Sequence, residues 1–352
     1  MALDRAFPTL EALSLSNQDD LPVMLPENFV TPHLRTLHLG NVAVSSVSSL
    51  LTNATANLIS LRLEKIQTSS YVHPEYLAQL ISSIPRLENL SISIIPFSPF
   101  RPKEIWHPQV TRAVLTNLRS LTYAGDCAYL EKMLALLGAP LLQLFRVNYF
   151  TQPTLALQSL SEFLGTIHDL NFGMAVVSFS GSVTVTYYPS QPSDSLSCLM
   201  FGMDNNMHPL KRQVATIAQI CTATTPALHT VHSLALEFDR PYVPHGFAAR
   251  RDLWRALLRS FETVVTLQAD VALALELCGV LVPDGGAERE ELLPTLCELV
   301  VVSRPPLLYN SFASFIHTRC LAGYPLNFRV IERRPSRSLS IPRFFYVSEC
   351  MI

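Results

Sequence analysis

The side chains that most often take part in catalysis or metal binding are scattered along this sequence. Ten histidines are present, and only His229 and His232 lie close together among apolar and hydroxyl residues. Two imidazoles three residues apart could contribute to a metal site, but no paired Cys/His spacing in the sequence suggests zinc. We therefore interpret both histidines as surface or packing residues and expect no metal.

The sequence motifs of the common enzyme classes are also missing. The sequence contains no GxxxxGK[ST] phosphate loop, no GxGxxG turn, no HExxH pair and no GxSxG elbow. We therefore predict no catalytic residue, no cofactor and a protein that is not an enzyme. An uncharacterised α/β enzyme is kept as the remote alternative.

Another set of polar side chains has a spacing suited to recognition. Each lies between two apolar residues, as His38 lies between Leu37 and Leu39. Successive side chains of a strand point to opposite faces, so these residues must leave the core. These central positions are Ser14, His38, Arg62, Ser91, Thr122, Arg146, Asn171, Ala235, Gln268 and Val300. From this set we predict partner contacts by His38, Arg62, Arg146, Asn171 and Gln268. The alternative is that they are only solvated strand residues.

The flanking apolar residues belong to a repeat of the form apolar-x-x-apolar-x-apolar. The first residues of its copies are Leu10, Leu34, Leu58, Leu87, Leu118, Leu142, Ile167, Val231, Val264 and Leu296. Successive copies lie about 24 to 33 residues apart, except for one longer gap after Ile167. That length fits one strand plus a return segment per repeat. A proline two places earlier, as at Pro32 and Pro85, sets the entry into several of the strands.

A single strand of this kind cannot bury its apolar face, but neighbouring copies can cover one another. The repeat therefore predicts an α/β fold: an irregular leucine-rich-repeat solenoid, or horseshoe, with a parallel concave sheet and convex helices. The return segments include a helix over 74–84 that begins near Pro74, and one that Asp126 caps and Gly138 ends. Further helices are expected around 160–163, 214–220, 253–258 and 312–316.

The repeat is interrupted once. Residues 175–188 contain two β-branched or alternating arms around Ser180 and Gly181, which predicts a β-hairpin, and the Ser- and Pro-rich residues 189–204 predict a loop. We expect one repeat domain over residues 1–331, with an insertion at about 174–208. Residues 332–352 are expected to form a poorly ordered tail, whose arginines are more typical of a solvated tail than of a nucleic-acid site.

Composition narrows the classes of protein further. The formal net charge of −2 gives no general attraction to nucleic acid or to an anionic membrane. The most apolar long stretch, Val264 to Val282, is interrupted by Gln268, Asp270 and Glu276, so we expect no membrane span there. Seven cysteines without a CxxC pair indicate reduced thiols and a cytoplasmic or nuclear location.

A second candidate contact surface lies around Trp254. Arginines at 250, 251 and 255 surround this residue, and an indole among arginines can anchor a protein partner. The interpretation that we favour is the buried side of an amphipathic helix whose arginines are solvated.

Several segments of the chain resemble the leucine-rich-repeat F-box-like proteins of mushroom-forming (basidiomycete) fungi. They are residues 7–13, 84–90, 253–267 and 292–299, and the resemblance covers about residues 7–331. It implies repeats that recruit a protein substrate to a cullin ubiquitin ligase through an F-box and a Skp-type adaptor. Because a repeat begins by residue 7, we expect this chain to lack the F-box and doubt that it binds the adaptor.

The predicted function is a protein–protein interaction scaffold, such as the substrate-recognition part of an F-box-type ligase receptor. The alternative is an adaptor or decoy that acts without the ligase. The expected partner is a protein of unknown identity, with neither a membrane nor nucleic acid as the ligand.

Overall fold

A tight turn followed by a short strand recurs along the chain. The computed structural model describes residues 7–16, 31–41, 57–66, 73–94, 112–150, 155–168, 170–190, 198–204, 209–238, 251–282, 292–303 and 310–332. In these turns the first apolar residue of the sequence repeat donates its N–H to the carbonyl three residues earlier, as Leu34 does to Thr31 and Leu118 to Leu115. The turn starts the strand and buries this apolar residue.

The described strands form one large sheet and one small one. They are β1 (Ala12–Ser16), β2 (Thr36–Gly40), β3 (Ser60–Ile66), β4 (Asn89–Ile94), β5 (Ala113–Val114), β6 (Ser120–Gly125), β7 (Leu137–Gly138), β8 (Leu144–Tyr149), β9 (Phe172–Phe179), β10 (Ser182–Pro189), β11 (Cys198–Asp204), β12 (Ser233–Phe238), β13 (Thr266–Asp270), β14 (Glu298–Ser303) and β15 (Asn327–Glu332). Within the described residues the large sheet has 13 strands in the order β1-β2-β3-β4-β6-β8-β11-β10-β9-β12-β13-β14-β15, and β5 pairs with β7. Apart from the two pairs that involve β10, neighbouring strands of the large sheet are parallel.

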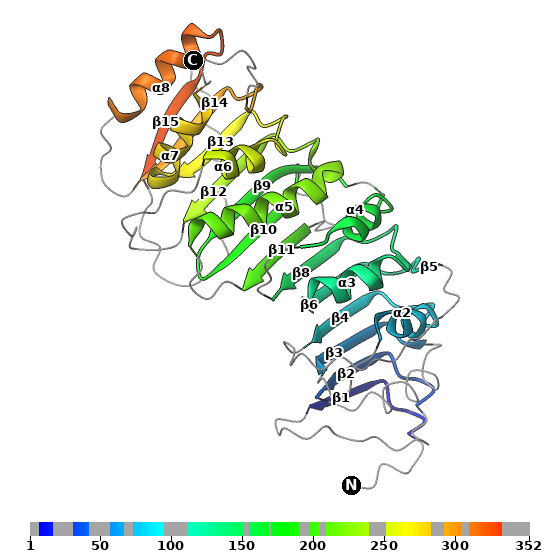
Figure 1. The fold of residues 1–352 in the computed structure, drawn as a ribbon. Helices are drawn as coiled ribbons and strands as arrows, with labels where there is room; N and C mark the ends of the chain where they lie inside the picture. The colour runs from blue at the N-terminus through cyan, green and yellow to red at the C-terminus, as the bar shows by residue number, and fades with distance from the viewer. Residues whose placement is uncertain are drawn as a thin grey trace.

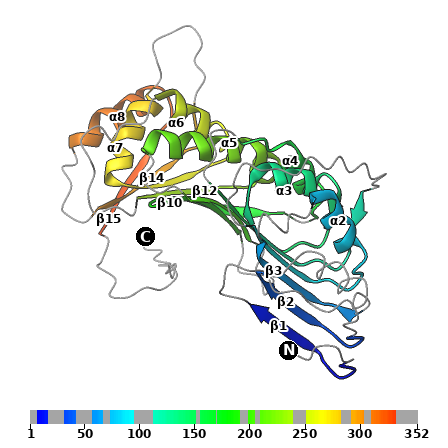
Figure 2. The ribbon, with the colours of Figure 1, turned by 60° about the horizontal axis from the view of Figure 1, so that its bottom comes forward.

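Helices connect many of the parallel strands and lie on one side of the large sheet (Figure 1). They are α2 (Pro74–Ser82), α3 (Cys127–Leu134), α4 (Gln158–Leu164), α5 (Leu210–Leu228), α6 (Arg251–Leu258), α7 (Val271–Leu281) and α8 (Asn310–Leu321). Figure 2 shows that the sheet is bent, with the helices along its outer, convex side. The predicted α/β class with a large, mostly parallel sheet is confirmed.

The core lies between the sheet and the helices. In each regular strand the two alternating apolar residues point to the helix side, and pairs such as Leu61 with Leu63 and Leu90 with Ile92 are at most 2% exposed. Burying one such side chain contributes about 1.5–3 kcal/mol. Each strand thus depends on its neighbours for most of its stabilisation.

The order of the strands departs from the order of the chain at one place. After β8 the chain forms α4 and then β9, but β9 does not pair with β8. Instead β11 lies parallel beside β8, and β10 lies antiparallel between β11 and β9. Two positions of the sheet therefore lie between β8 and β9, and the later strands β10 and β11 occupy them.

This arrangement confirms one sequence prediction and overturns another. The hairpin exists, because β9 and β10 pair antiparallel around Ser180 and Gly181. The prediction of a loop throughout 189–204 was wrong, because residues 198–204 form β11. Leu199 and Phe201 of β11 are buried in the same register as Phe145 and Val147 of β8.

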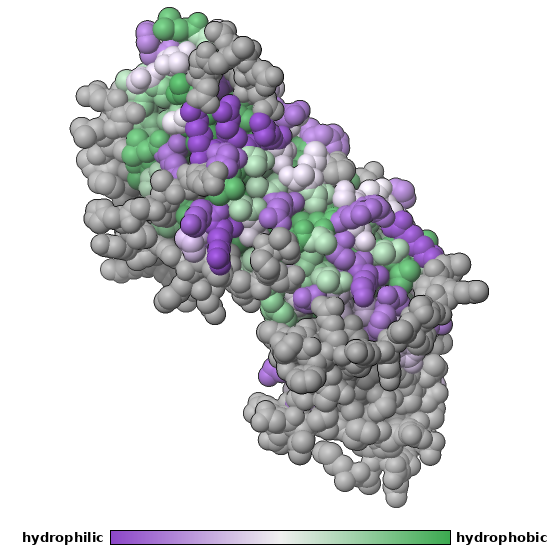
Figure 3. All heavy atoms as spheres, in the orientation of Figure 1, coloured by the Kyte–Doolittle hydropathy of each residue, from purple (hydrophilic) through white to green (hydrophobic). Residues whose placement is uncertain are grey.

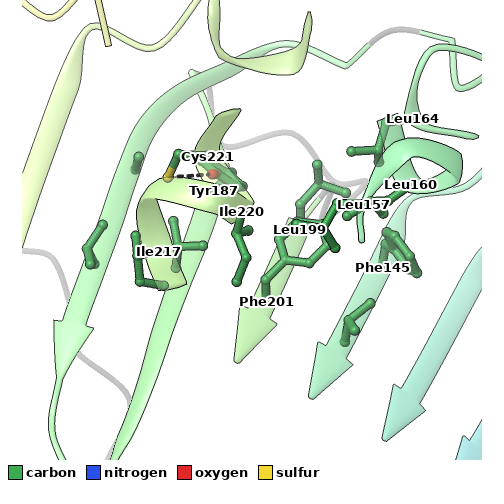
Figure 4. Close-up of a cluster of buried hydrophobic side chains, with 14 of the residues drawn as sticks. Phe145, Leu157, Leu160, Leu164, Tyr187, Leu199, Phe201, Ile217, Ile220 and Cys221 are labelled. Carbon is green, nitrogen blue, oxygen red and sulfur yellow. Dashed lines mark hydrogen bonds between the residues drawn. The ribbon is translucent and has the colours of Figure 1, made fainter. Parts of the chain in front are cut away.

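The inserted strands share one core with the rest of the sheet (Figure 4). Tyr187 and Phe201 bring their rings together at a centroid distance of 6.4 Å, and Phe201 in turn meets Phe145 of β8 at 5.7 Å. On the helix side Tyr187 lies against Cys221 of α5 (Figure 4), at 3.5 Å between the hydroxyl and the sulfur. The insertion is therefore a continuous part of the sheet and its core.

The helix ends test two further predictions. Pro74 is the first residue of α2 as expected. Asp126 caps α3 as expected, because its Oδ1 accepts a hydrogen bond from the N–H of Tyr129. The prediction that Gly138 ends this helix was wrong: α3 ends at Leu134, and Gly138 lies in β7.

The last described strand, β15, was missing from the sequence prediction. It extends to Glu332, a residue that the sequence analysis placed in the tail. Residues 333–352 of that tail lie outside the described part of the chain.

Candidate partner-binding face

Strand alternation gives the sheet a second side, which the helices leave uncovered and which we call the outward face. In β2, Leu37 and Leu39 are buried against the helix side. His38 between them lies on the outward face, with 27% of its side chain exposed. The same alternation places one row of non-core side chains on each strand.

These side chains line up across the whole sheet. The register pairs His38 with Arg62, and Thr122 with Arg146. We call this line the central row: Ser14, His38, Arg62, Ser91, Thr122, Arg146, Met200, Thr186, Val176, Ala235, Gln268, Val300 and Arg329. Adjacent positions are about 4.8 Å apart, the usual distance between paired strands. The row is thus a continuous track across the outward face.

Four of the five residues proposed to contact a partner lie in this row. The structure places His38, Arg62, Arg146 and Gln268 there, on β2, β3, β8 and β13. Their contact with a partner stays a prediction.

Asn171 does not lie in the central row. It precedes β9, and its Oδ1 accepts a hydrogen bond from the hydroxyl of Ser190 at 3.3 Å. The apolar triplet ending at Phe172 was predicted to be the repeat, whereas the register with β12 shows that Ala175 and Val177 are the inward pair. Val176 therefore occupies the position that was assigned to Asn171.

At the N-terminal end of the outward face, four side chains form a hydrogen-bonded network. The Ser14 hydroxyl lies 3.1 Å from Nδ1 of His38, and Nε2 of His38 lies 3.0 Å from Oε2 of Glu64. Nε of Arg62 donates to Oε1 of the same carboxylate at 2.7 Å. Partial burial raises the pKa of Glu64, but the hydrogen bonds from Arg62 and His38 outweigh it and hold that pKa below its usual value.

Glu64 lies next to an irregularity of the backbone in β3. Lys65 has a φ of 52° and forms an irregularity where the register between β3 and β4 shifts. Glu64, just before it, pairs with Gly40 of β2. A Cβ at Gly40 would lie 2.9 Å from Oγ of Ser16 in β1, so this part of the outward face has no room for a side chain at position 40.

Near the middle of the outward face, Arg146 extends from β8 and is exposed. Its strand neighbours in the sheet are Thr122 and Met200. Burial raises the pKa of Cys198, and the nearby guanidinium of Arg146 offsets part of that rise. Burial also raises the pKa of Tyr188, with Cys198 and Glu237 adding to the effect and Thr186 and Arg146 opposing it.

The C-terminal end of the outward face has a second glutamate with two partners. The Thr266 hydroxyl donates to Oε2 of Glu298 at 3.2 Å, and Nε of Arg329 lies 2.7 Å from its Oε1. Gln268 lies beside this group in the central row and is partly exposed.

Four members of the central row were not predicted from the sequence: Met200, Thr186, Val176 and Arg329. All four lie in strands of the insertion or in β15. The spacing of Leu196, Leu199 and Phe201 was the available signal for β11, and the alternation of Phe328 with Val330 was the signal for β15.

Two members of the row that the sequence analysis did include have little exposed surface. Ala235 and Val300 are each only 3% exposed. They therefore offer little area to a partner, as does Val176, which is 7% exposed, and the accessible part of the row lies at the remaining positions.

Two other candidate sites from the sequence are the pair of histidines and Trp254. His229 and His232 are exposed at the turn after α5. Across the described ranges, no three His, Cys, Asp or Glu side chains come together in a group that could hold a metal ion.

Trp254 is fully buried, as favoured from the sequence, and its ring meets that of Phe179 edge-on at 5.8 Å.

The helix-covered side has a different surface. Figure 3 shows hydrophilic residues interspersed with apolar ones there, with hydrophilic residues gathered around α6. Among the described helices, none is long and apolar enough to cross a membrane.

Comparison with known protein families and with curated proteins found no match. No model of a known protein family matches the sequence, and no curated protein matches it significantly.

Proposed function

We propose that this chain is a leucine-rich-repeat solenoid that binds another protein through its outward face. The observation that carries the proposal is the central row, in which side chains from 13 paired strands of the described sheet form one continuous track that none of the described helices covers. Concave sheets of repeat proteins offer extended surfaces of this kind to protein partners.

The repeated hydrogen bonding supports the solenoid part of the proposal. The carbonyl of Arg35 accepts from both Ile59 and Ser60 of the next repeat, and the carbonyl of Glu88 does the same for Arg119 and Ser120. Each strand thus begins by bonding to one fixed position of the preceding repeat. A fold in which each unit contacts mainly its neighbours is the defining property of a solenoid.

Side chains in the turns form a second set of hydrogen bonds between the repeats. The residue just before the first apolar position reaches the turn of the preceding repeat: Asn57 donates to the carbonyl of Pro32 at 2.9 Å, and Asn117 to that of Pro85 at 2.8 Å. Thr263 likewise donates to the carbonyl of Val231 at 2.8 Å. One sequence position therefore has the same role along the chain.

The resemblance to leucine-rich-repeat F-box-like proteins extends the proposal to a pathway. In that case the outward face is the substrate-recognition part of a ubiquitin ligase receptor, and the alternative is an adaptor or decoy that acts without the ligase. A pull-down with a purified Skp-type adaptor separates them. Retention of the adaptor by this chain supports the receptor, and no retention supports the adaptor or decoy.

We propose the cytoplasm or the nucleus as its location. The six described cysteines are free, including buried Cys127, Cys221 and Cys278, which agrees with a reducing compartment. A fluorescent fusion found in the secretory pathway would contradict this location.

The binding role is tested by naming the partner and then blocking the face. Proximity labelling identifies the partner, whose affinity is then measured for Ser91→Tyr, which adds bulk to the central row. Lys211→Glu, an exposed position on α5, is the matched control on the helix side. We expect Ser91→Tyr to weaken binding at least tenfold and Lys211→Glu to leave it unchanged. Equal affinity of both variants and the native protein would refute the assignment of this face.

One observation favours a second candidate function, a hydrolase. A hydroxyl, an imidazole and a carboxylate in series, as in Ser14, His38 and Glu64, is the arrangement that activates a serine nucleophile. In such a step the Ser14 oxygen would attack an ester carbonyl while its proton passes to Nδ1 of His38, and the bond to the alcohol would break as the alcohol takes that proton. Water would then release the acyl group from Ser14 by the same route.

We rank this second function below binding, because Arg62 already neutralises the Glu64 carboxylate that would stabilise a charged His38. Hydrolysis of p-nitrophenyl acetate distinguishes the two. Turnover that is lost in Ser14→Ala and kept in Ser16→Ala would establish a hydrolase, and equal rates for both variants would exclude this site.

A further inference from the structure

The three arginines of the central row differ in their partners. Arg62 is paired with Glu64, and Arg329 is paired with Glu298. Among the described residues, Arg146 has neither a hydrogen bond nor an ion pair with a carboxylate, although its side chain is exposed on the same face. The middle of the outward face therefore carries one uncompensated positive charge.

Apolar side chains lie on the β9 side of this charge, whereas its neighbour on β6 is Thr122, in line with the polar row on β1 to β6. Leu144 lies two residues before Arg146 on β8, and Met200 is its neighbour on β11. Tyr188 of β10 and Met174 of β9 pair next to them. All four are partly exposed. We call Leu144, Arg146, Tyr188, Met174 and Met200 the central patch.

The composition of the central patch is typical of a protein-binding site. Interface centres are enriched in Tyr, Met and Arg, and methionine adapts its shape to different apolar partners. Apolar side chains of a bound segment would exclude water from around Arg146, and a guanidinium with less water around it binds a carboxylate more strongly.

The size of the central patch sets the length of its ligand. Its residues lie on the four adjacent strands β8, β11, β10 and β9. Three steps of about 4.8 Å give a width of roughly 14 Å, which an extended peptide crosses in about four residues.

We propose that the central patch binds a short segment of the partner protein in which an aspartate or glutamate is flanked by large apolar side chains. The carboxylate pairs with Arg146, and the apolar side chains cover Met200, Met174 and Tyr188. This inference rests on the proposed function, since it names the chemistry of the partner for the same outward face.

The test is a selection from a displayed library of random dodecapeptides on the full chain. The baits are the native protein, Arg146→Glu, and Lys211→Glu as the control with the same charge change on the helix side. We expect native and Lys211→Glu baits to enrich peptides with Asp or Glu next to Leu, Phe, Met or Tyr. The Arg146→Glu bait should enrich Lys or Arg in place of the acidic residue.

The affinity of a selected peptide gives the second readout. By fluorescence anisotropy, Arg146→Ala should bind an acidic peptide at least about tenfold more weakly than the native protein, the loss expected for one charge-assisted hydrogen bond. The matched peptide with Gln for Glu should lose about as much on the native protein, and the two changes together should cost little more than either alone.

Three outcomes overturn the proposal, and the first two separate it from the proposed function. In the first outcome, the native and Arg146→Glu baits select equally acidic peptides, and Ser91→Tyr still weakens the binding of these peptides. The outward face then binds peptides, but Arg146 does not bind their carboxylate. If selected peptides bind with the same affinity to Ser91→Tyr and Arg146→Ala as to the native protein, the outward face itself is wrong. A selection that enriches no sequence on the native bait also refutes the central patch as a peptide site.

Discussion

The indole Nε1 of Trp254 in α6 donates a hydrogen bond to Oε1 of Glu276 in α7, at 2.8 Å. This bond fixes one helix against the next on the side of the sheet away from the outward face. It explains why a tryptophan flanked by arginines belongs to the core in this protein, with its polar atom satisfied by a neighbouring repeat.

Replacing Trp254 with Phe should therefore lower stability and leave partner binding intact. The change removes the donor to Glu276 and part of a buried ring, at a cost of about 1–3 kcal/mol. Urea unfolding measures it, with Glu276→Gln as a control that keeps an acceptor oxygen and should lose less. Unchanged stability together with lost partner binding would make Trp254 a contact residue after all.

Glu131 in α3 should give the stability of the protein a distinct pH dependence. Its carboxylate accepts hydrogen bonds from the N–H groups of Ser159 and Leu160 at the start of α4, at 2.6 and 3.0 Å. Burial nevertheless raises its pKa above the usual value of 4.5, because these hydrogen bonds offset only part of the cost of burying the charge. The folded protein thus holds this proton more tightly than the unfolded chain.

The sign of the effect follows from that difference. The protonated acid contributes stability that is fully present below about pH 4.5 and is lost as the pH rises through the raised pKa. Relative to Glu131→Gln, which does not titrate, the free energy of unfolding of the native protein should fall across this range and then level off. A difference that stays constant from pH 4 to pH 8 would show that the Glu131 pKa is not raised.

The thiols should react in two groups. Burial raises the pKa values of Cys127, Cys221 and Cys278 to about 12, so only roughly one in ten thousand of each is a thiolate at pH 8. Cys297 and Cys320 are exposed. Mass spectrometry after brief iodoacetamide treatment should find label on the exposed pair, and label on the buried three only after denaturation with guanidinium chloride. Rapid labelling of Cys221 in the native protein would contradict the packing of α5 on Tyr187.

Two glycines of the inserted strands form a matched pair for testing the sheet order. A Cβ at Gly173 would lie 2.7 Å from Cα of Ser190, whereas a Cβ at Gly181 would have nothing within 4 Å. We expect Gly173→Ala to lower the free energy of unfolding by about 1–3 kcal/mol and Gly181→Ala to change it by less than about 0.5 kcal/mol. Thermal or urea unfolding shows the difference, and equal effects would mean that Ser190 does not pack against β9 as described.

The regular repeats were predictable from the sequence because each has all three apolar positions. Leu34, Leu37 and Leu39 specify a turn and a strand with one buried face, and the structure shows both. The strand β15 escaped prediction because it lacks the first apolar position, where the sequence has Pro325. Without that residue, only a short alternation remains, which is weak evidence for a strand.

The strand β11 escaped prediction for another reason. Leu196, Leu199 and Phe201 have the full spacing of the motif, so the signal was present in the sequence. They follow a segment rich in Ser and Pro, whose composition favours a loop. The spacing of the apolar residues was the better guide here, because Leu199 and Phe201 join the buried core of the sheet.

The error at Asn171 has a different cause. Ile167, Leu170 and Phe172 match the motif as well as Phe172, Ala175 and Val177 do, and only the pairing with β12 selects the second triplet. The networks around Glu64 and Glu298 could not be predicted either. They join side chains from different register positions of neighbouring strands, since Glu64 is paired with Gly40 rather than with His38, and Glu298 with Asn327 rather than with Arg329. The spacing of the apolar residues does not specify such contacts.

The most direct test of the outward face is site-specific photo-crosslinking in cells. A benzophenone amino acid is placed at Thr122, in the central row of β6, or at Ala128, exposed on the helix side in α3. The face assignment predicts a discrete crosslinked partner from position 122 and none from position 128. A partner crosslinked from position 128 but not from position 122 would contradict it.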